Sequence, residues 1–149
     1  MNGKIYENLA LCGALDPVAV VNSEVFTDVI DMQKFHKVLA TLLIGDMANE
    51  TIIWRCVTCD SAGNNVAALK TATTLAASAT VNDNTQSMIE VDGDDLPGTT
   101  NADRYIKFGV VTSSTSGGIM SIAVQGESKM LPANNDNLAS INEIEIDND

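Results

Sequence analysis

Apolar residues occur along this chain in short runs, and polar turn residues separate the runs. The run 29–44 begins with apolar and polar residues mixed, becomes nearly continuous in apolar residues from Val38, and stops at Gly45-Asp46. It is short, it is closed by turn residues, and the β-rich segment 51–59 follows it at once. It therefore predicts one long buried strand rather than a helix. The first indication from the sequence is a β scaffold.

Eight segments with strand character recur along the chain. The predicted strands are 18–25, 35–44, 51–59, 66–76, 85–92, 104–112, 118–126 and 140–146. Segments rich in Gly, Asn, Asp and Ser, which tolerate turn conformations, lie between them. Seven or eight short strands separated by such turns predict an all-β protein, either a β-sandwich or a jelly roll.

Strict alternation in two of these segments identifies the side chains expected in the core. Alternate residues of a strand point to opposite faces, so the larger apolar residues of each segment share one face. The residues predicted to face the core are Ile106, Phe108, Val110, Met120, Ile122 and Val124.

The segment 69–79 is ambiguous on its own. Its alanines are compatible with a short helix, whereas its threonines favour a strand. The all-β context favours the strand.

A chain of 149 residues is the size of one domain with one sizeable core. We expect an N-terminal arm at 1–17, a β-sandwich body at 18–130, and a linker with a C-terminal strand at 131–149. In the last segment Ile141, Ile144 and Ile146 alternate with polar and acidic residues. This pattern is typical of an edge or exchanged strand whose outer face repels further pairing.

Charge and composition narrow the range of partners and locations. The net charge is −12 and the eight basic residues are scattered, which argues against nucleic acid and anionic membranes as partners. No apolar segment approaches the ~20 residues of a membrane-spanning helix. The N-terminus lacks the apolar core of a signal peptide and the cysteines number three, so we expect an intracellular origin with reduced thiols.

Three short motifs could carry metal or acid–base chemistry, and each lacks necessary partners. Cys56 and Cys59 form a single C-x-x-C motif, whereas a zinc site needs four ligands and His36 is the only histidine. His36 has no evident nucleophile or acidic pair beside it. The turn 92–95 is acidic but lacks the spacing and final glutamate of an EF-hand, so an ordinary turn is favoured over a weak calcium site.

The remaining motifs also argue against an enzyme. The sequence contains no phosphate-binding glycine loop and no nucleophile elbow. Arg104-Tyr105 could form a binding patch, but an arginine that begins a strand before a half-buried tyrosine is ordinary in β proteins. We expect no catalytic residues, no metal and no cofactor.

Several segments in a fixed order resemble small structural proteins of tailed bacteriophages, over about residues 15–126. These segments are Val29-Ile30-Asp31-Met32 leading to Phe35, the strand that contains Trp54, the Asp83-Asn84 turn, Met88-Ile89-Glu90-Val91, and Arg104-Tyr105-Ile106-Lys107. The resemblance is to short β-sandwich or jelly-roll proteins that decorate or cement the capsid.

This resemblance implies attachment to the outside of the phage head, as dimers or trimers that contact the major capsid protein and bridge capsomers. The terminal arms are the predicted sites of capsid or subunit contact. The candidate contact residues are Lys4, Ile5, Tyr6, Leu9, Ile141, Ile144 and Ile146. The alternatives are a tail or neck component of the virion, a carbohydrate-binding β-sandwich, and a small hydrolase.

Overall fold

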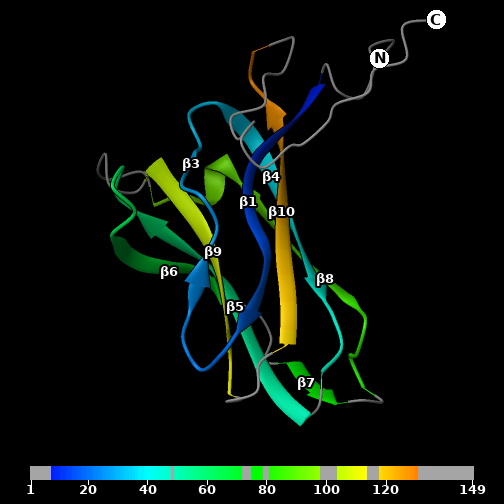
Figure 1. Cartoon of the computed structure of the whole chain (residues 1–149). Coiled ribbons are helices and arrows are strands. Elements are labelled where there is room, and N and C mark those ends of the chain that lie inside the picture. Colours follow the sequence, from blue (N-terminus) through cyan, green and yellow to red (C-terminus); the bar gives the residue numbers. More distant parts are fainter. Residues whose placement is uncertain are drawn as a thin grey trace, which may run out of the picture.

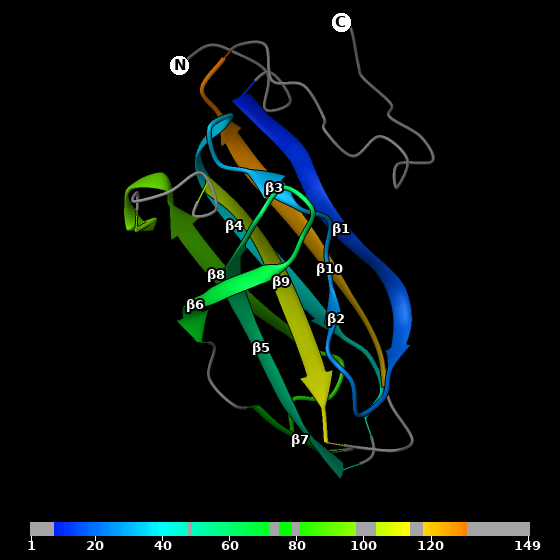
Figure 2. The same cartoon turned by 90° about the vertical axis from the view of Figure 1, so that its left-hand side faces the viewer.

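The computed structural model shows two antiparallel sheets packed face to face (Figures 1 and 2). The structure describes residues 8–47, 49–71, 75–78, 81–97, 104–113 and 118–130. The predicted strand 140–146 and the predicted linker lie outside these residues. The prediction of an all-β sandwich is confirmed.

Sheet A has four strands in the order β1-β10-β4-β8. Its strands are β1 (Leu9–Val20), β10 (Gly118–Ser128), β4 (Phe35–Ile44) and β8 (Gln86–Asp92). A single turn of 3-10 helix, η1 (Gly93–Asp95), follows β8.

Sheet B has six strands and is built around β9 and β5. The order is β2-β9-β5-β6, with β3 also paired to β9 and β7 also paired to β5. Its strands are β2 (Val25–Phe26), β3 (Ile30–Asp31), β9 (Tyr105–Thr112), β5 (Asn49–Cys59), β6 (Asn65–Thr71) and β7 (Leu75–Ser78).

The core lies between the inner faces of the two sheets, as period-2 alternation requires. All six residues predicted from alternation belong to it, and the larger buried side chains include Trp54, Phe35 and Leu42. Trp54 of sheet B reaches across the core, where its Nε1 donates a hydrogen bond to Ser87 Oγ of sheet A at 3.1 Å.

The run 29–44 is not one long buried strand. It contains β3, a turn at 32–34, and β4, which is buried on one face only. Leu43 on the opposite face keeps 40% of its surface exposed. A continuous apolar run is typical of a strand buried on both faces, and here nothing among the described residues covers the outer side of β4.

The predicted boundary between arm and body at residue 17 is wrong, because β1 begins at Leu9 and pairs with β10 along its length. Two irregularities interrupt its register, at Leu11/Gly13 and Leu15/Val18. Each shifts the inward and outward positions, so the sequence shows no simple alternation. Pro17 lies in the second irregularity of an edge strand, where a missing N–H is tolerated.

The predicted strand 18–25 is also wrong, because it joins the end of β1 to the beginning of β2 across a turn. Asn22 adopts a φ of 43° there, a conformation that asparagine tolerates better than most residues. The turn carries the chain from sheet A to sheet B.

The ambiguous segment 69–79 is strand wherever the structure describes it, as favoured from the context. The single strand predicted at 66–76 is two strands, since β6 ends at Thr71 and β7 begins at Leu75. Both pair with β5, β6 with its second half and β7 with its first.

Candidate functional site

The two cysteines of the C-x-x-C motif lie in β5, as predicted, and both are buried free thiols. The register between β5 and β9 is unbroken, so Cys56 and Cys59, three residues apart, point to opposite faces of sheet B. Burial raises the pKa of Cys56 to about 12, and the nearby Cys59 adds to this effect. Burial also raises the pKa of Cys59, opposed in part by Lys107. Neither thiol is poised as a thiolate nucleophile at neutral pH.

We therefore expect the cysteines of the folded protein to resist thiol reagents. Cys12, Cys56 and Cys59 are all at most 2% exposed, and the raised pKa values lower the thiolate fraction of the latter two further. Ellman's reagent at pH 8 should label the three thiols rapidly only after unfolding in denaturant. Rapid labelling of one thiol in the native protein would contradict the burial of that site.

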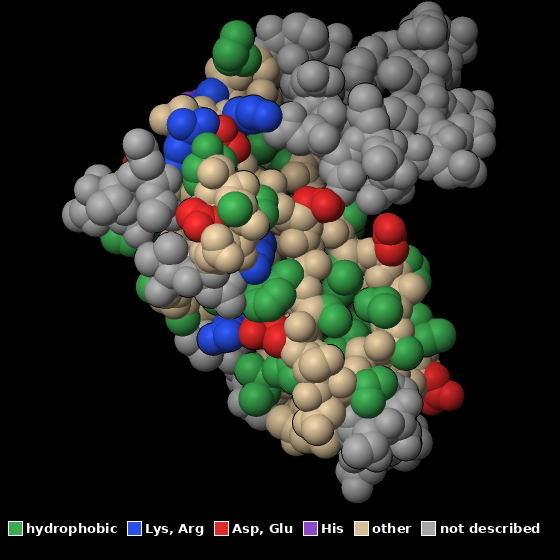
Figure 3. All heavy atoms as spheres, turned by 60° about the vertical axis from the view of Figure 1, so that its left-hand side comes forward, with side chains coloured by type: hydrophobic (Ala, Val, Ile, Leu, Met, Phe, Trp, Pro, Cys, Tyr) green, Lys and Arg blue, Asp and Glu red, His purple; other side chains and the backbone are tan. Residues whose placement is uncertain are grey.

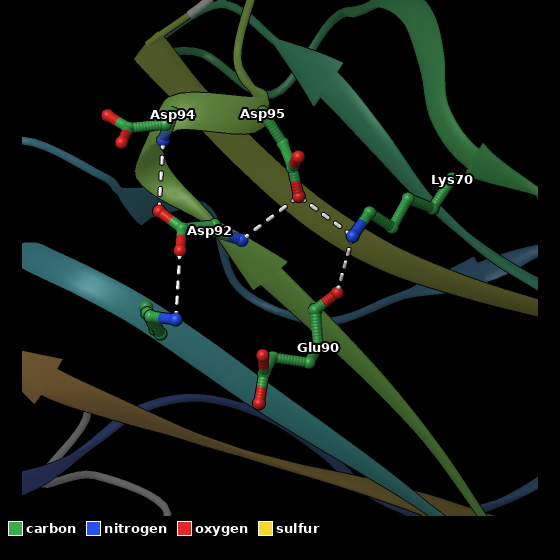
Figure 4. Close-up of polar contacts among 6 residues, drawn as sticks. Lys70, Glu90, Asp92, Asp94 and Asp95 are labelled. Carbon is green, nitrogen blue, oxygen red and sulfur yellow. Dashed lines mark hydrogen bonds and ion pairs between the residues drawn. The ribbon is translucent and has the colours of Figure 1, made fainter.

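The acidic turn after β8 is an internally bonded structure rather than an open cluster of carboxylates (Figure 4). The Asp92 N–H donates to Asp95 Oδ2, in a capping box between Asp92 and Asp95, and the Asp94 N–H also donates to Asp92 Oδ1. Lys37 Nζ lies 3.0 Å from Asp92 Oδ2, and Lys70 Nζ lies 2.8 Å from Asp95 Oδ2.

These contacts explain the low pKa values of the turn. The Asp94 N–H and then Lys37 lower the pKa of Asp92, and Lys70 and then the Asp92 N–H lower the pKa of Asp95. Both carboxylates are occupied within the chain, while the Asp94 side chain points away from them (Figure 4). The turn is therefore a structural element at the end of β8.

Lys70 also protects the outer edge of sheet A. Its Nζ donates a second hydrogen bond, of 2.9 Å, to the backbone carbonyl of Glu90 in β8 (Figure 4). Strand β8 is at the edge of the sheet, and a carbonyl on its free side could otherwise accept a hydrogen bond from an added strand. Lys70 therefore makes this edge a poor place for strand addition.

His36 and Arg104, the other residues considered from the sequence, do not form a reactive site. His36 is exposed near the beginning of β4. Arg104 forms a two-pronged ion pair with Asp31, and its guanidinium lies 5.0 Å from the centre of the Tyr105 ring. The bond to Arg104 lowers the pKa of Asp31. This pair fastens β3 to the beginning of β9.

Of the residues predicted to contact capsid or subunit, Leu9 alone falls in the described part of the chain. It begins β1, opposite Glu127 of β10, with 37% of its surface exposed. The others, Lys4, Ile5, Tyr6, Ile141, Ile144 and Ile146, lie outside the described residues.

A groove of about 640 Å³ lies between β1 and the segment that contains β2. Its walls are residues 14–18 on one side and 25–28 on the other. Asp28 fastens the two walls together, since its carboxylate accepts a bond of 3.1 Å from the Ala14 N–H and its own N–H donates to the Ala14 carbonyl. The groove is a built feature of the fold rather than a gap between loops.

The surface around this groove combines apolar and acidic side chains. Val18 and Val21 are exposed at the end of β1 and just after it, and Val25 and Phe26 are half-buried in β2. Figure 3, which looks onto this side of the molecule, shows hydrophobic side chains gathered on it. Asp16 and Asp28 supply carboxylates to the lining. The groove suits an apolar segment that also carries a basic group.

The outer face of sheet A is a second candidate surface. Leu43, Met88 and Ile119 lie on it with exposures of 40%, 59% and 62%. The sequence pattern does not single out these residues as a surface, because each is simply part of a predicted strand. The signal was the loss of alternation in Leu42-Leu43-Ile44 and Ile119-Met120, where consecutive apolar residues must face both the core and the outside.

Two further classes of site are not found among residues 8–130 where the structure describes them. No group of three or more His, Cys, Asp or Glu side chains is arranged there to hold a metal ion. In the same part of the chain, no helix has the length and apolar character needed to cross a membrane.

No protein-family model matches the chain, and no curated protein matches it. Among solved structures, it is similar to one described as "Bacillus endospore appendages form a novel family of disulfide-linked pili", with 9% identity, a TM-score of 0.42, and coverage of 87% of this chain and 95% of that one. It is also similar to the CBM22-1 and GH10 modules of a Clostridium thermocellum endo-1,4-β-D-xylanase, with 13% identity and a TM-score of 0.42. That match covers 87% of this chain and 28% of the xylanase chain. A family 11 carbohydrate-binding module of Clostridium thermocellum matches with 12% identity, a TM-score of 0.35, and coverage of 86% and 92%. These values assign the chain to no family.

Proposed function

We propose that this chain is a non-catalytic structural protein of a tailed-phage virion, which decorates the outside of the head and stabilises contacts between capsomers. The observation that carries the proposal is the built groove between β1 and β2, with exposed apolar residues around it. A decoration protein needs a rigid body with a docking surface. The resemblance in sequence to phage structural proteins supplies the identity of the partner, the major capsid protein.

The rigidity required for this role comes from contacts that tie the groove to both sheets. Asp28 joins the groove walls, and Thr27 Oγ1 accepts a hydrogen bond of 3.1 Å from the Phe108 N–H in the middle of β9. Arg55 and Glu24 form a two-pronged ion pair, with bonds of 2.8 and 2.7 Å, just before β2. A docking surface that is already ordered loses little conformational entropy on binding.

Binding to a lattice also explains why such a protein would prefer assembled capsids. If one copy of the decoration protein contacts two capsomers, the second contact forms at a high effective concentration. Affinity for the assembled shell should then exceed affinity for free subunits by ~10²-fold or more.

The test is co-sedimentation of the purified chain with undecorated capsids and, separately, with free capsid subunits. We expect tight binding to the shells, with density outside the shell that bridges neighbouring capsomers in electron microscopy. Val18→Glu in the groove should abolish binding, whereas Val81→Glu, at a valine that is 53% exposed elsewhere, should not. Location in the tail would favour the tail or neck alternative, and absence from particles would contradict the proposal.

The carbohydrate-binding alternative is less well supported by the side chains. Sugar binding on a β-sandwich commonly uses exposed aromatic rings, since their apolar faces stack on the sugar. Among the described residues, Phe35, Trp54 and Phe108 are buried, and Phe26 and Tyr105 are half-buried. No described aromatic residue offers an open platform.

A further inference from the structure

The outer face of sheet A is divided by its register into a charged end and an uncharged end. Across the strands, one row consists of Leu9, Glu127, Lys37 and Asp92. Two residues further along lie Leu11, Gln125, Leu39 and Glu90. All the charges on the regular rows of this face belong to these two rows.

The uncharged end begins with the next row. Its residues are Ala14, Ala123, Thr41 and Met88, then Ser121, Leu43 and Gln86, and finally Ala19, Ile119 and Gly45. The outer face of a solvated antiparallel sheet normally carries polar residues. Asp16 lies exposed in the second irregularity of β1, opposite Ser121 at the edge of this end. The regular rows themselves, on a chain with a net charge of −12, can lose their water without leaving a charge unpaired.

The sizes of the side chains in these rows are complementary to one another. Consider a second copy placed face to face, with a two-fold axis along the strands between β10 and β4. The operation keeps each residue in its own row and exchanges the two sides of the axis. A residue of β1 therefore faces the partner's β8, and a residue of β10 faces the partner's β4. The partner's Met88 lies over Ala14, the partner's Leu43 over Ser121, and the partner's Ile119 over Gly45. In each of the three uncharged rows a large side chain meets a small one.

One pair of charges, Glu127 and Lys37, is complementary under the same operation, while Asp92 and Glu90 lie over the partner's Leu9 and Leu11. Glu127 of β10 and Lys37 of β4 are opposite each other in the first row, so the axis between these strands brings Glu127 over the partner's Lys37. Symmetry repeats this contact, which gives two oppositely charged contacts at the rim. Rim charges of this kind fix the register of an interface more than they add affinity.

We propose that the outer face of sheet A is the docking site for a second copy of this chain, in a two-fold dimer with its axis along β10 and β4. Two sheets packed face to face keep their strands within about 30° of each other, which this axis permits. With strands about 4.8 Å apart and same-face residues about 6.8 Å apart, the footprint is on the order of 500 Å² before side-chain relief. That is near the lower end of stable interfaces, so the dimer should dissociate on dilution.

The dimer is independent of the proposed capsid role, and it is measured in solution without capsids. Sedimentation equilibrium of the full chain should show twice the 15.7 kDa chain mass at high concentration. Leu43→Lys buries two unpaired charges by symmetry and should weaken the dimer by ~100-fold or more. The matched control is Ile53→Lys, at a residue that is 39% exposed on the outer face of sheet B, and it should leave the dimer intact. A monomeric wild-type chain, or a Leu43→Lys variant that still dimerises, would overturn the proposal.

A mixing experiment tests the register of the two copies. Lys37→Glu and Glu127→Lys each place like charges opposite each other at both symmetry-related contacts between positions 37 and 127. Each should weaken the homodimer by ~10-fold or more. When the two variants are mixed, both contacts regain opposite charges, so the heterodimer should form more tightly than either homodimer. Circular dichroism verifies that each variant is folded. Failure of the mixture to recover association would exclude this axis.

Discussion

Trp54→Ala is expected to lower the free energy of unfolding by about 3–5 kcal/mol, because it removes the largest side chain of the core. Trp54 lies in β5 with 1% of its surface exposed, and its ring centre is 6.4 Å from that of Phe108 in β9. Its Nε1 also donates the hydrogen bond to Ser87 of the opposite sheet. The substitution leaves a cavity and removes a polar link between the sheets. Such a loss is a large part of the stability of a typical domain, about 5–15 kcal/mol.

The measurement is urea unfolding followed by circular dichroism, since the substitution removes the single tryptophan and its fluorescence. Trp54→Phe is the matched control, because it retains an aromatic ring but cannot donate to Ser87. We expect its loss of stability to be clearly smaller than that of Trp54→Ala. A cost below ~1 kcal/mol for Trp54→Ala would contradict its place in a close-packed core.

The strands with one well-defined face could be predicted from the sequence because their pattern depends only on local alternation. Strand β4 has the predicted bounds, and the predicted inward faces of β9 and β10 are in the core. In β10, a smaller or more polar residue stands between each inward residue and the next, from Met120 to Val124. Alternation of this kind is visible in the sequence whichever strand is the pairing partner.

Strands whose pattern depends on distant partners could not be predicted in this way. In β1 the two irregularities shift the faces, and only the pairing with β10 reveals that the segment is a strand. Lys107 of β9 is another example, since a lysine between apolar neighbours predicts an exposed position. It is only 9% exposed, because its Nζ lies 3.9 Å from the Phe26 ring centre and donates to the Gly63 carbonyl at 2.6 Å. Both partners are far away in the sequence.

The candidate surfaces were the least predictable part of the molecule. The sequence pattern predicts contact sites in the terminal segments, where apolar residues alternate with charged ones. The groove needs residues 14–18 and 25–28 to meet, and the outer face of sheet A needs four strands in register. A surface assembled from segments up to about a hundred residues apart, such as Ala14 and Ala123, leaves no local signature.

Gly126→Ala is the second substitution for which we expect a large effect, a loss of about 1–3 kcal/mol from overpacking. Gly126 lies in β10 on the core face, beneath the ring of Phe35. A Cβ atom at this position would lie 2.5 Å from Phe35 Cδ1 and 2.9 Å from its Cγ. Phe35 is 2% exposed at the beginning of β4, so its ring cannot move away without disturbing the core. The lower chain entropy of alanine in the unfolded state, worth ~0.4–1 kcal/mol, does not offset this contact.

A double-mutant cycle with Phe35→Leu separates the contact from a general intolerance of alanine at position 126. Leucine lacks the ring atoms that a Cβ would meet, so Gly126→Ala should cost clearly less in the Phe35→Leu background than in the wild type. Urea unfolding of the four proteins gives the coupling energy, which for residues in contact is typically about 0.5–3 kcal/mol. If the two substitutions are additive, or if Gly126→Ala stabilises the wild type, the Phe35 ring does not dictate glycine here. A clear coupling would show that this glycine is present because β10 must pass directly under a buried aromatic ring.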